Sequence, residues 1–197
     1  MYRALYLAGA GYLAICGAIV LRARERATPV QPANVEPRAP GVRFGPPEHE
    51  WFLAIKPNCN AVEVEVAHRM HPPSSTLEGQ AFSAACYALA GKIDAARRVI
   101  DQLHPDRRHR AAGIVFEVAH PVADAGDNRS AGPIMELVVE YWPNHYMALY
   151  HAGMAEFALG QPALARKNLQ AFLSYYNQND GWTRSARETL EQLKGVK

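Results

Sequence analysis

Three glycines recur at a nearly constant interval along the chain. Gly91, Gly126 and Gly160 lie 35 and 34 residues apart, and an alanine follows each of them five positions later. Other positions keep the same register, with a small residue seven places before each glycine and large apolar residues nine and twelve places after it. A repeat of this length is one helical supersecondary unit, which buries its apolar face against the next copy. The interval therefore predicts an all-α fold built as a stack of helical hairpins.

The residues in the repeating columns indicate how such hairpins pack. Two antiparallel helices approach closely only where small side chains face each other, and an apolar stripe at helical spacing must be buried. The column residues are Ala84, Ala119, Gly153, Ala96, Ala131, Ala165, Ile100, Met135, Leu169, Leu103, Val138 and Phe172. This pattern resembles the tetratricopeptide repeat (TPR) family over residues 77–176. The resemblance implies a TPR-like α-solenoid of three to four helical hairpins that binds proteins.

The stack is predicted to continue on both sides of this region. Ala61 lies 35 residues before Ala96, which is one repeat length. We therefore predict that residues 61–70 form the second helix of an earlier hairpin, and that its short first helix contains Trp51 and Phe52. At the other end, residues 183–194 carry apolar side chains at helical spacing between charged ones, namely Ala186, Leu190 and Leu193. One apolar and one solvated face are typical of the helix that closes a repeat array. We expect a C-terminal capping helix there.

Prolines in the middle and last hairpins bear on where the helices begin. Pro121 lies inside the predicted first helix of the middle hairpin, and Pro133 follows Gly132 where the second helix should already run. Because proline lacks an amide hydrogen and disfavours a helix interior, we expect a kink or a late helix start in this unit. Pro162, just after Gly160, suits the first turn of a helix.

The amino-terminal segment has the composition of a membrane helix. Residues 4–21 contain no charged side chain over 18 positions, and Arg22, Arg24 and Arg26 follow them. This length is at the lower end of what spans a bilayer core as a helix. We predict a single N-terminal transmembrane anchor over residues 1–26, whose arginines are attracted to lipid headgroups.

Two kinds of signal sequence are alternatives to a retained anchor. A cleaved secretory signal needs small residues at a cleavage site ahead of a polar start, and the segment has no such site. A lipoprotein signal is suggested by Cys16, but Ile15 before it is bulky and apolar residues continue after it. The retained anchor is therefore the favoured interpretation.

Small side chains follow one face of the predicted anchor at steps of four and three residues. They are Ala4, Ala8, Gly11, Ala14 and Ala18. Small residues allow a second helix to approach closely within a bilayer, so we predict a transmembrane packing face. The alternative explanation is that alanine and glycine are simply frequent in membrane helices.

A proline-rich linker separates the anchor from the repeats. Residues 28–47 contain six prolines and little that could form a core. We predict a linker over residues 27–47, which in an extended form reaches on the order of 60 Å. The predicted repeat domain, residues 48–197, carries 15 basic and 17 acidic residues. This balance does not favour nucleic acid as a partner.

The side of the membrane that carries the repeats has two competing indications. The three arginines after the span favour a cytoplasmic repeat domain by the positive-inside rule. A short head followed by one apolar stretch is also the layout of a bacterial signal-anchor, whose body is exported to the periplasm. Cys59 and Cys86 could pair in an oxidising compartment or remain packed thiols. We predict a cytoplasmic domain and keep the periplasm as the alternative.

The eight histidines are the residues that bear on catalysis or metal binding. His68 and His71 lie three apart on a predicted helix, but no third ligand stands at a supporting spacing. The chain has no Cys-x-x-Cys-His haem motif, no glycine loop for phosphate and no nucleophile elbow. We therefore predict no enzyme activity, cofactor, metal or small-molecule substrate. The alternative is a metal-handling or catalytic domain that uses His68 and His71.

The resemblance places a binding surface on the first helix of each hairpin. Its larger side chains are predicted to form a partner-binding groove: Phe116, His120, Met147, Tyr150, Met154 and Phe157. Further residues of this surface are Glu78, Ala81, Ala85, Ala88, Leu89, Ala123, Asp124 and Ala158. Methionine and aromatic side chains adapt to apolar partners. The alternative is that several of these residues are buried between hairpins.

One TPR subclass binds acidic chaperone tails through a basic clamp on these first helices. The corresponding positions here include Ala81, Phe82, Ala85, Glu117 and His151, so the clamp is absent and a chaperone tail is disfavoured. A more apolar peptide, a helix or a flat protein face suits the groove better. These features predict a membrane-anchored protein–protein interaction scaffold, as an accessory or assembly subunit of a bacterial membrane complex such as a respiratory or photosynthetic one.

Overall fold

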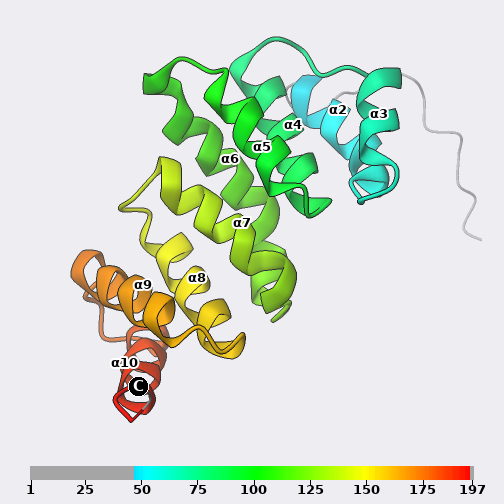
Figure 1. The fold of residues 1–197 in the computed structure, drawn as a ribbon. Coiled ribbons are helices and arrows are strands. Elements are labelled where there is room, and N and C mark those ends of the chain that lie inside the picture. The colour runs from blue at the N-terminus through cyan, green and yellow to red at the C-terminus, as the bar shows by residue number, and fades with distance from the viewer. Residues whose placement is uncertain (1–46, 196–197) are drawn as a thin grey trace, which may run out of the picture. The chain divides into compact units, whose positions relative to one another are not determined.

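The computed structural model describes residues 47–195, which form helices and no strand (Figure 1). The predicted anchor with its packing face, and all but the last residue of the linker, lie outside the described residues. Within 47–195, every helix is too short or too polar to cross a bilayer. The elements are α2 (Pro47–Ile55), the 3-10 turn η1 (Lys56–Asn58), α3 (Val64–Met70), α4 (Leu77–Leu89), α5 (Ile93–Asp101), α6 (Pro105–Asp124), α7 (Asn128–Tyr141), α8 (Tyr146–Ala158), α9 (Pro162–Tyr175) and α10 (Gly181–Leu193).

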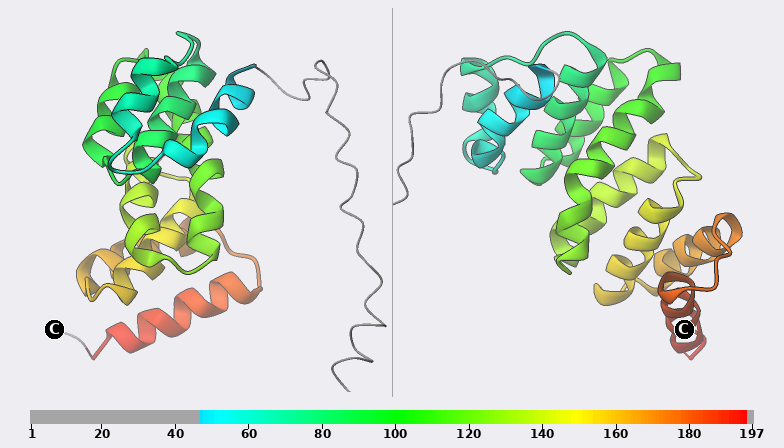
Figure 2. Two further views of the ribbon diagram at one scale, coloured as in Figure 1. Left: turned by 90° about the vertical axis from the view of Figure 1, so that its right-hand side faces the viewer. Right: turned by 180° about the vertical axis from the view of Figure 1, so that it is seen from behind.

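From α4 onward, helices that follow one another in the chain lie side by side (Figure 2). Helices α4 and α5, α6 and α7, and α8 and α9 form three antiparallel hairpins, and α4 also packs against α6. Helix α10 packs on α8 and α9, as expected for a capping helix. The all-α helical repeat is therefore confirmed for the described part of the chain.

The recurring glycines close the three hairpins. Gly91, Gly126 and Gly160 have φ values of 73°, 77° and 72°, in the left-handed region that glycine adopts without a steric penalty. At the first of these turns, the amide of Gly91 donates to the carbonyl of Ala88 and the amide of Lys92 donates to the carbonyl of Tyr87, both over 2.9 Å. This is the Schellman arrangement, and the same pair of bonds recurs after α6 and α8. The interval in the sequence is thus the interval between identical turns.

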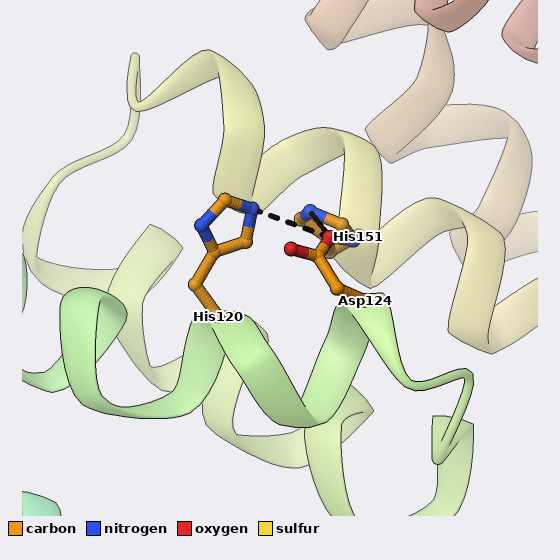
Figure 3. A group of neighbouring side chains, drawn as sticks. All are labelled: His120, Asp124 and His151. Carbon is orange, nitrogen blue, oxygen red and sulfur yellow. Dashed lines mark ion pairs between the residues drawn. The ribbon is translucent and has the colours of Figure 1, made fainter.

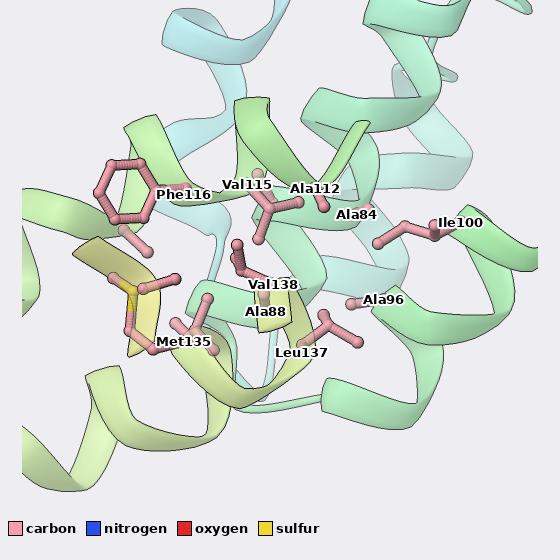
Figure 4. Packing of buried hydrophobic residues seen from close by; sticks show 14 of the residues in the cluster. Ala84, Ala88, Ala96, Ile100, Ala112, Val115, Phe116, Met135, Leu137 and Val138 are labelled. Carbon is pink, nitrogen blue, oxygen red and sulfur yellow. The ribbon is translucent and has the colours of Figure 1, made fainter. Parts of the chain in front are cut away.

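The repeating columns form the core of the stack. All column residues are buried except Leu103, which is half-buried. Ala84, Ala96 and Ile100 meet side chains of α6 and α7 in one cluster (Figure 4). At Gly153, a Cβ atom would lie 2.7 Å from Cγ of Leu169, so only glycine fits the contact between α8 and α9. The small-residue column therefore marks the closest approach of paired helices.

The middle hairpin corrects one prediction. Helix α7 does not start late but begins at Asn128, five residues before Pro133. The carboxylate of Asp127 accepts from the amide of Ser130 over 3.1 Å and so caps the new helix at its first turn. Pro133 is exposed, and it removes the hydrogen bond to the carbonyl of Arg129 without ending the helix. Pro121 likewise lies inside α6, near its end.

The first hairpin, α2 and α3, is shorter than the others. Its second helix begins at Val64 and not at Ala61, because Asn60 Oδ1 accepts from the amides of the two residues ahead of that start and holds them in a turn. A disulfide joins Cys59 to Cys86 of α4, with an S–S distance of 2.05 Å. The pairing that the sequence left open is thus present.

Candidate functional site

The predicted groove residues lie on neighbouring helices but are not equally accessible. Phe116 and His120 share one face of α6, and Tyr150, Met154 and Phe157 share one face of α8. Phe116 is 5 % exposed and Tyr150 is 8 % exposed, whereas His120, Met147, Met154 and Phe157 are half-buried. Part of this surface therefore holds the helices together and part of it faces outward.

Aromatic contacts explain the burial of Phe116. Its ring stacks on His120 with a centroid distance of 4.7 Å and lies 4.2 Å from the ring of His145. His145 in turn meets Trp142 edge-on at 4.7 Å. The Nδ1 atom of His145 accepts from the amide of Ala148 over 3.2 Å and caps α8, and burial lowers the pKa of this imidazole. Phe116 therefore belongs to the packing that positions α8 against α6.

Helix α10 covers the face of α8 that contains Tyr150. Trp182 of α10 meets the Tyr150 ring edge-on at 5.0 Å, and Tyr150 also contacts Phe172 at 5.1 Å. The hydroxyl of Thr189 donates to the sulfur of Met154 over 3.6 Å. A pocket of about 210 Å³ lies between α6, α7, α8 and α10. It is lined by Ala123, Asp124, Asn128, Ala131, Tyr150, His151, Met154 and Trp182.

Two histidines and an aspartate converge beside this pocket. The Nε2 atoms of His120 and His151 lie 3.5 Å and 3.7 Å from Oδ1 of Asp124. His120 and Asp124 come from α6, His151 comes from α8, and the three side chains point toward one another (Figure 3). Histidine, cysteine, aspartate and glutamate can all bind a metal ion. Within residues 47–195, these three are the group of such residues whose possible metal-binding atoms all lie within 4.8 Å of one another.

Both imidazoles in this cluster have a buried nitrogen without a hydrogen-bond partner. These atoms are Nε2 of His120 and Nε2 of His151. His151 is 7 % exposed, and burial, together with the neighbouring His120, lowers the pKa of its ring to about 4. At neutral pH His151 is therefore uncharged, and its ring can offer a lone pair to an electrophile.

The sequence contained a signal for this cluster that our interpretation did not use. His120 and Asp124 lie four residues apart, which places them on one helical face, and both were assigned to the groove. His151 stands nine places before Gly160 and so belongs to a column next to the groove residues. Trp182 was missed because the capping helix was treated only as a lid for the stack.

The alternative site at His68 and His71 does not form. His68 is buried, its Nδ1 lies 2.8 Å from the carbonyl oxygen of Val64, and its Nε2 lies 3.0 Å from the hydroxyl of Ser83. Its ring stacks on Tyr87 at 4.3 Å. His71 is exposed beyond the end of α3. Because both nitrogens of His68 are already hydrogen-bonded, this histidine stabilises the first hairpin and offers no lone pair to a metal.

A buried carboxyl group lies on another face of α8. Glu156 is 2 % exposed, and its oxygens accept from Nδ2 of Asn168 over 2.8 Å and 3.0 Å. The same amide nitrogen lies 3.4 Å from an oxygen of Glu136. Burial, reinforced by the neighbouring Glu136, raises the pKa of Glu156 to about 8. This residue is therefore protonated at neutral pH and acts as part of the packing between α7, α8 and α9.

Comparisons with known proteins agree with the repeat architecture. The tetratricopeptide repeat family model matches residues 147–179, which include most of α8 and all of α9. No curated protein and no solved structure matches the chain. TPR units generally mediate binding of protein partners, typically as non-enzymatic scaffolds. The match supports a TPR-like helical repeat with a role in protein–protein interaction.

Proposed function

We propose that this chain is a membrane-anchored protein–protein interaction scaffold, acting as an accessory or assembly subunit of a bacterial membrane complex, respiratory or photosynthetic. The observation that carries the proposal is a strip of half-buried side chains on α6 and α8, within and beside the repeat that matches the TPR family: His120, Met147, Met154 and Phe157. Residues 4–21 supply the proposed anchor, and residues 27–47 supply the spacer.

The chemistry of the strip favours an apolar partner surface. Met147 and Phe157 are half-buried, so part of each side chain remains available for contact. Trp182, 38 % exposed, extends the strip onto α10. Aromatic and methionine side chains are enriched at protein interfaces because they contribute large, adaptable contact areas. Glu117 is exposed and His151 is buried, so neither provides a basic clamp for an acidic tail.

The disulfide indicates on which side of the membrane the repeat domain lies. Disulfides persist in oxidising compartments and are rare in the bacterial cytoplasm. The Cys59–Cys86 bond therefore supports export of the repeat domain to the periplasm, against the cytoplasmic location that the arginines favour. We adopt the exported orientation in the proposal.

Site-specific photo-crosslinking in native membranes tests the scaffold. A photoreactive phenylalanine analogue in place of Phe157 is expected to give a defined crosslinked partner band. The matched control is the same analogue at Gln170, an exposed position on α9 outside the strip. Equal crosslinking from both positions, or none from either, would contradict the proposed groove.

The orientation has a separate test. In a Cys16→Ser variant, a membrane-permeant maleimide applied to denatured, unreduced protein is expected to label no thiol, and reduction should expose two. Free thiols before reduction would contradict the exported orientation.

The proposed packing face is tested by Gly11→Leu, which should release the protein from its complex in mild detergent, with Leu13→Ile as the control.

A further inference from the structure

The cluster of His120, Asp124 and His151 has the donor atoms of a transition-metal site. Imidazole nitrogen and carboxylate oxygen bind Zn²⁺ at about 2.0–2.2 Å, so two ligand atoms of one tetrahedral ion lie about 3.4 Å apart. The Nε2 atoms of the two histidines lie 3.5 Å and 3.7 Å from Oδ1 of Asp124. All three ligand atoms lie within 4.8 Å of one another. Small side-chain rotations would complete the geometry.

Hydrogen bonding does not account for this arrangement. Distances of 3.5 Å and 3.7 Å exceed a normal N–H to oxygen bond, and both Nε2 atoms are buried without a partner. A buried polar group left unsatisfied costs about 1–3 kcal/mol, so two that face the same carboxylate call for an explanation. His151 is more than nine-tenths buried, and its free nitrogen points into the cluster (Figure 3). One bound cation would satisfy both nitrogens and the carboxylate together.

We propose that His120, Asp124 and His151 bind a divalent transition-metal ion of the Zn²⁺ type. The uncharged state of the buried His151 ring at neutral pH suits this role, because a metal binds the neutral imidazole. A purely electrostatic site for Mg²⁺ or Ca²⁺ would instead require several oxygen ligands. The site shares His120 and Asp124 with the proposed groove surface, but it needs no residue of a partner protein, so metal binding can be tested on the isolated chain.

The position of the cluster gives the ion a structural consequence. Two ligands come from α6 and one from α8, so the metal joins the middle hairpin to the last one. Asp124 and His151 also line the pocket of about 210 Å³ that Trp182 borders. Three protein ligands leave a fourth tetrahedral position for water. Bound metal is therefore expected to stabilise the contact between these hairpins.

Calorimetric titration of purified full-length protein with ZnCl₂ tests the site. The protein should carry a purification tag without histidine and be freed of metal with a chelator. We expect one Zn²⁺ per chain, a rise in melting temperature on binding, and no comparable effect of MgCl₂. Substitution with Co²⁺ should give the visible absorption bands of a low-symmetry, four-coordinate ion. Absence of Zn²⁺ binding in the wild type would overturn the proposal.

Conservative variants locate the binding. Asp124→Asn and His151→Gln should each weaken Zn²⁺ binding by about 100-fold and abolish the thermal shift. His109→Gln, which removes an exposed histidine of the same helix, should leave the affinity unchanged. Asp124 is exposed, so Asp124→Asn should keep the circular dichroism of the wild type even if His151→Gln unfolds the chain. Binding that survives Asp124→Asn, or that is lost in His109→Gln, would contradict the site.

Discussion

The first hairpin and the last one are held in the stack by different means. Helices α8 and α9 contain 13 and 14 residues and join through Gly160 in a left-handed turn. Helices α2 and α3 contain 9 and 7 residues and join through η1, where no described residue has a positive φ. The last hairpin therefore follows the repeat rules, and the first one departs from them.

Packing follows the same division. The last hairpin buries Leu169 against Gly153, a contact that needs a glycine on one side. The first hairpin buries a small apolar cluster of Phe52, Ile55 and Val64 against α4. It adds individual bonds to this cluster: Trp51 Nε1 donates to the carbonyl of His71 over 2.9 Å, His68 bonds to Ser83, and Cys59 is linked to Cys86. The difference teaches that a hairpin outside the repeat register needs specific polar and covalent links to stay attached to the stack.

Breaking the disulfide should have the largest effect on this comparison. Reduction is expected to destabilise the first hairpin by about 3 kcal/mol, because the bond closes a loop of 27 residues in the unfolded chain. Urea unfolding with and without reductant measures the loss, and faster amide exchange should be confined to α2, α3 and their contacts with α4. A Cys59→Ser variant should no longer respond to reductant. Equal exchange changes in α8 and α9 would contradict the division.

Enlarging Gly153 should break the close packing of the last hairpin. Gly153→Val is expected to cost about 2 kcal/mol, because the new side chain would overlap Leu169. Gly132→Ala is the matched control: its Cβ would lie 3.2 Å from Cβ of Ala155, and the gain in helix propensity should offset that strain. Thermal unfolding of both variants checks the prediction, which fails if the two lose similar stability.

The buried acid of α8 should make the last hairpin sensitive to pH. The pKa of Glu156 is raised from 4.5 in the unfolded chain to about 8, so the folded state holds the proton more tightly. Its stabilising contribution is complete below pH 4.5 and is lost as pH rises through 8. Glu156→Gln should flatten this part of the stability curve. Glu188→Gln, an exposed site on α10, should leave the slope as it is.

Changing a turn glycine should have the smallest effect. Gly160→Ala is expected to cost about 1 kcal/mol, because alanine is strained at a φ of 72° although no atom lies near its Cβ. Gly181→Ala, at the start of α10 with equally open surroundings and no positive φ, should be neutral. If both substitutions are neutral in thermal unfolding, the left-handed turns are not what sets the repeat interval.

The parts of the fold that local rules determine could be predicted from the sequence. The hairpin stack, the buried columns and the capping helix were predicted because each depends on a few residues within one or two helical turns. The late helix start, one of two alternatives predicted for this unit, was wrong because Asp127 caps a helix that begins at Asn128 and continues past Pro133. A side-chain cap of this kind is visible in the sequence, but the sequence does not show that the cap prevails over Pro133.

The candidate site could be predicted only in part, because it depends on how separate helices lie against each other. Register placed His120 on the correct face of α6 but could not bring His151 of α8 to within 3.7 Å of Asp124. It also could not show that Trp182 covers Tyr150, because α10 lies outside the repeat period. Whether a groove residue is buried or half-buried therefore depends on contacts between different hairpins and with α10, which the sequence of one repeat does not show.

The Cys59–Cys86 bond has a mechanical consequence for the anchored chain that we propose. A pulling force that enters at Pro47 runs along α2 to Cys59 and crosses directly to Cys86, near the end of α4. Residues 60–85, including α3, lie outside this load path and experience no tension. The disulfide thus carries the force past residues 60–85. The first structure to bear load beyond it is the last turn of α4, where the regular hairpins begin.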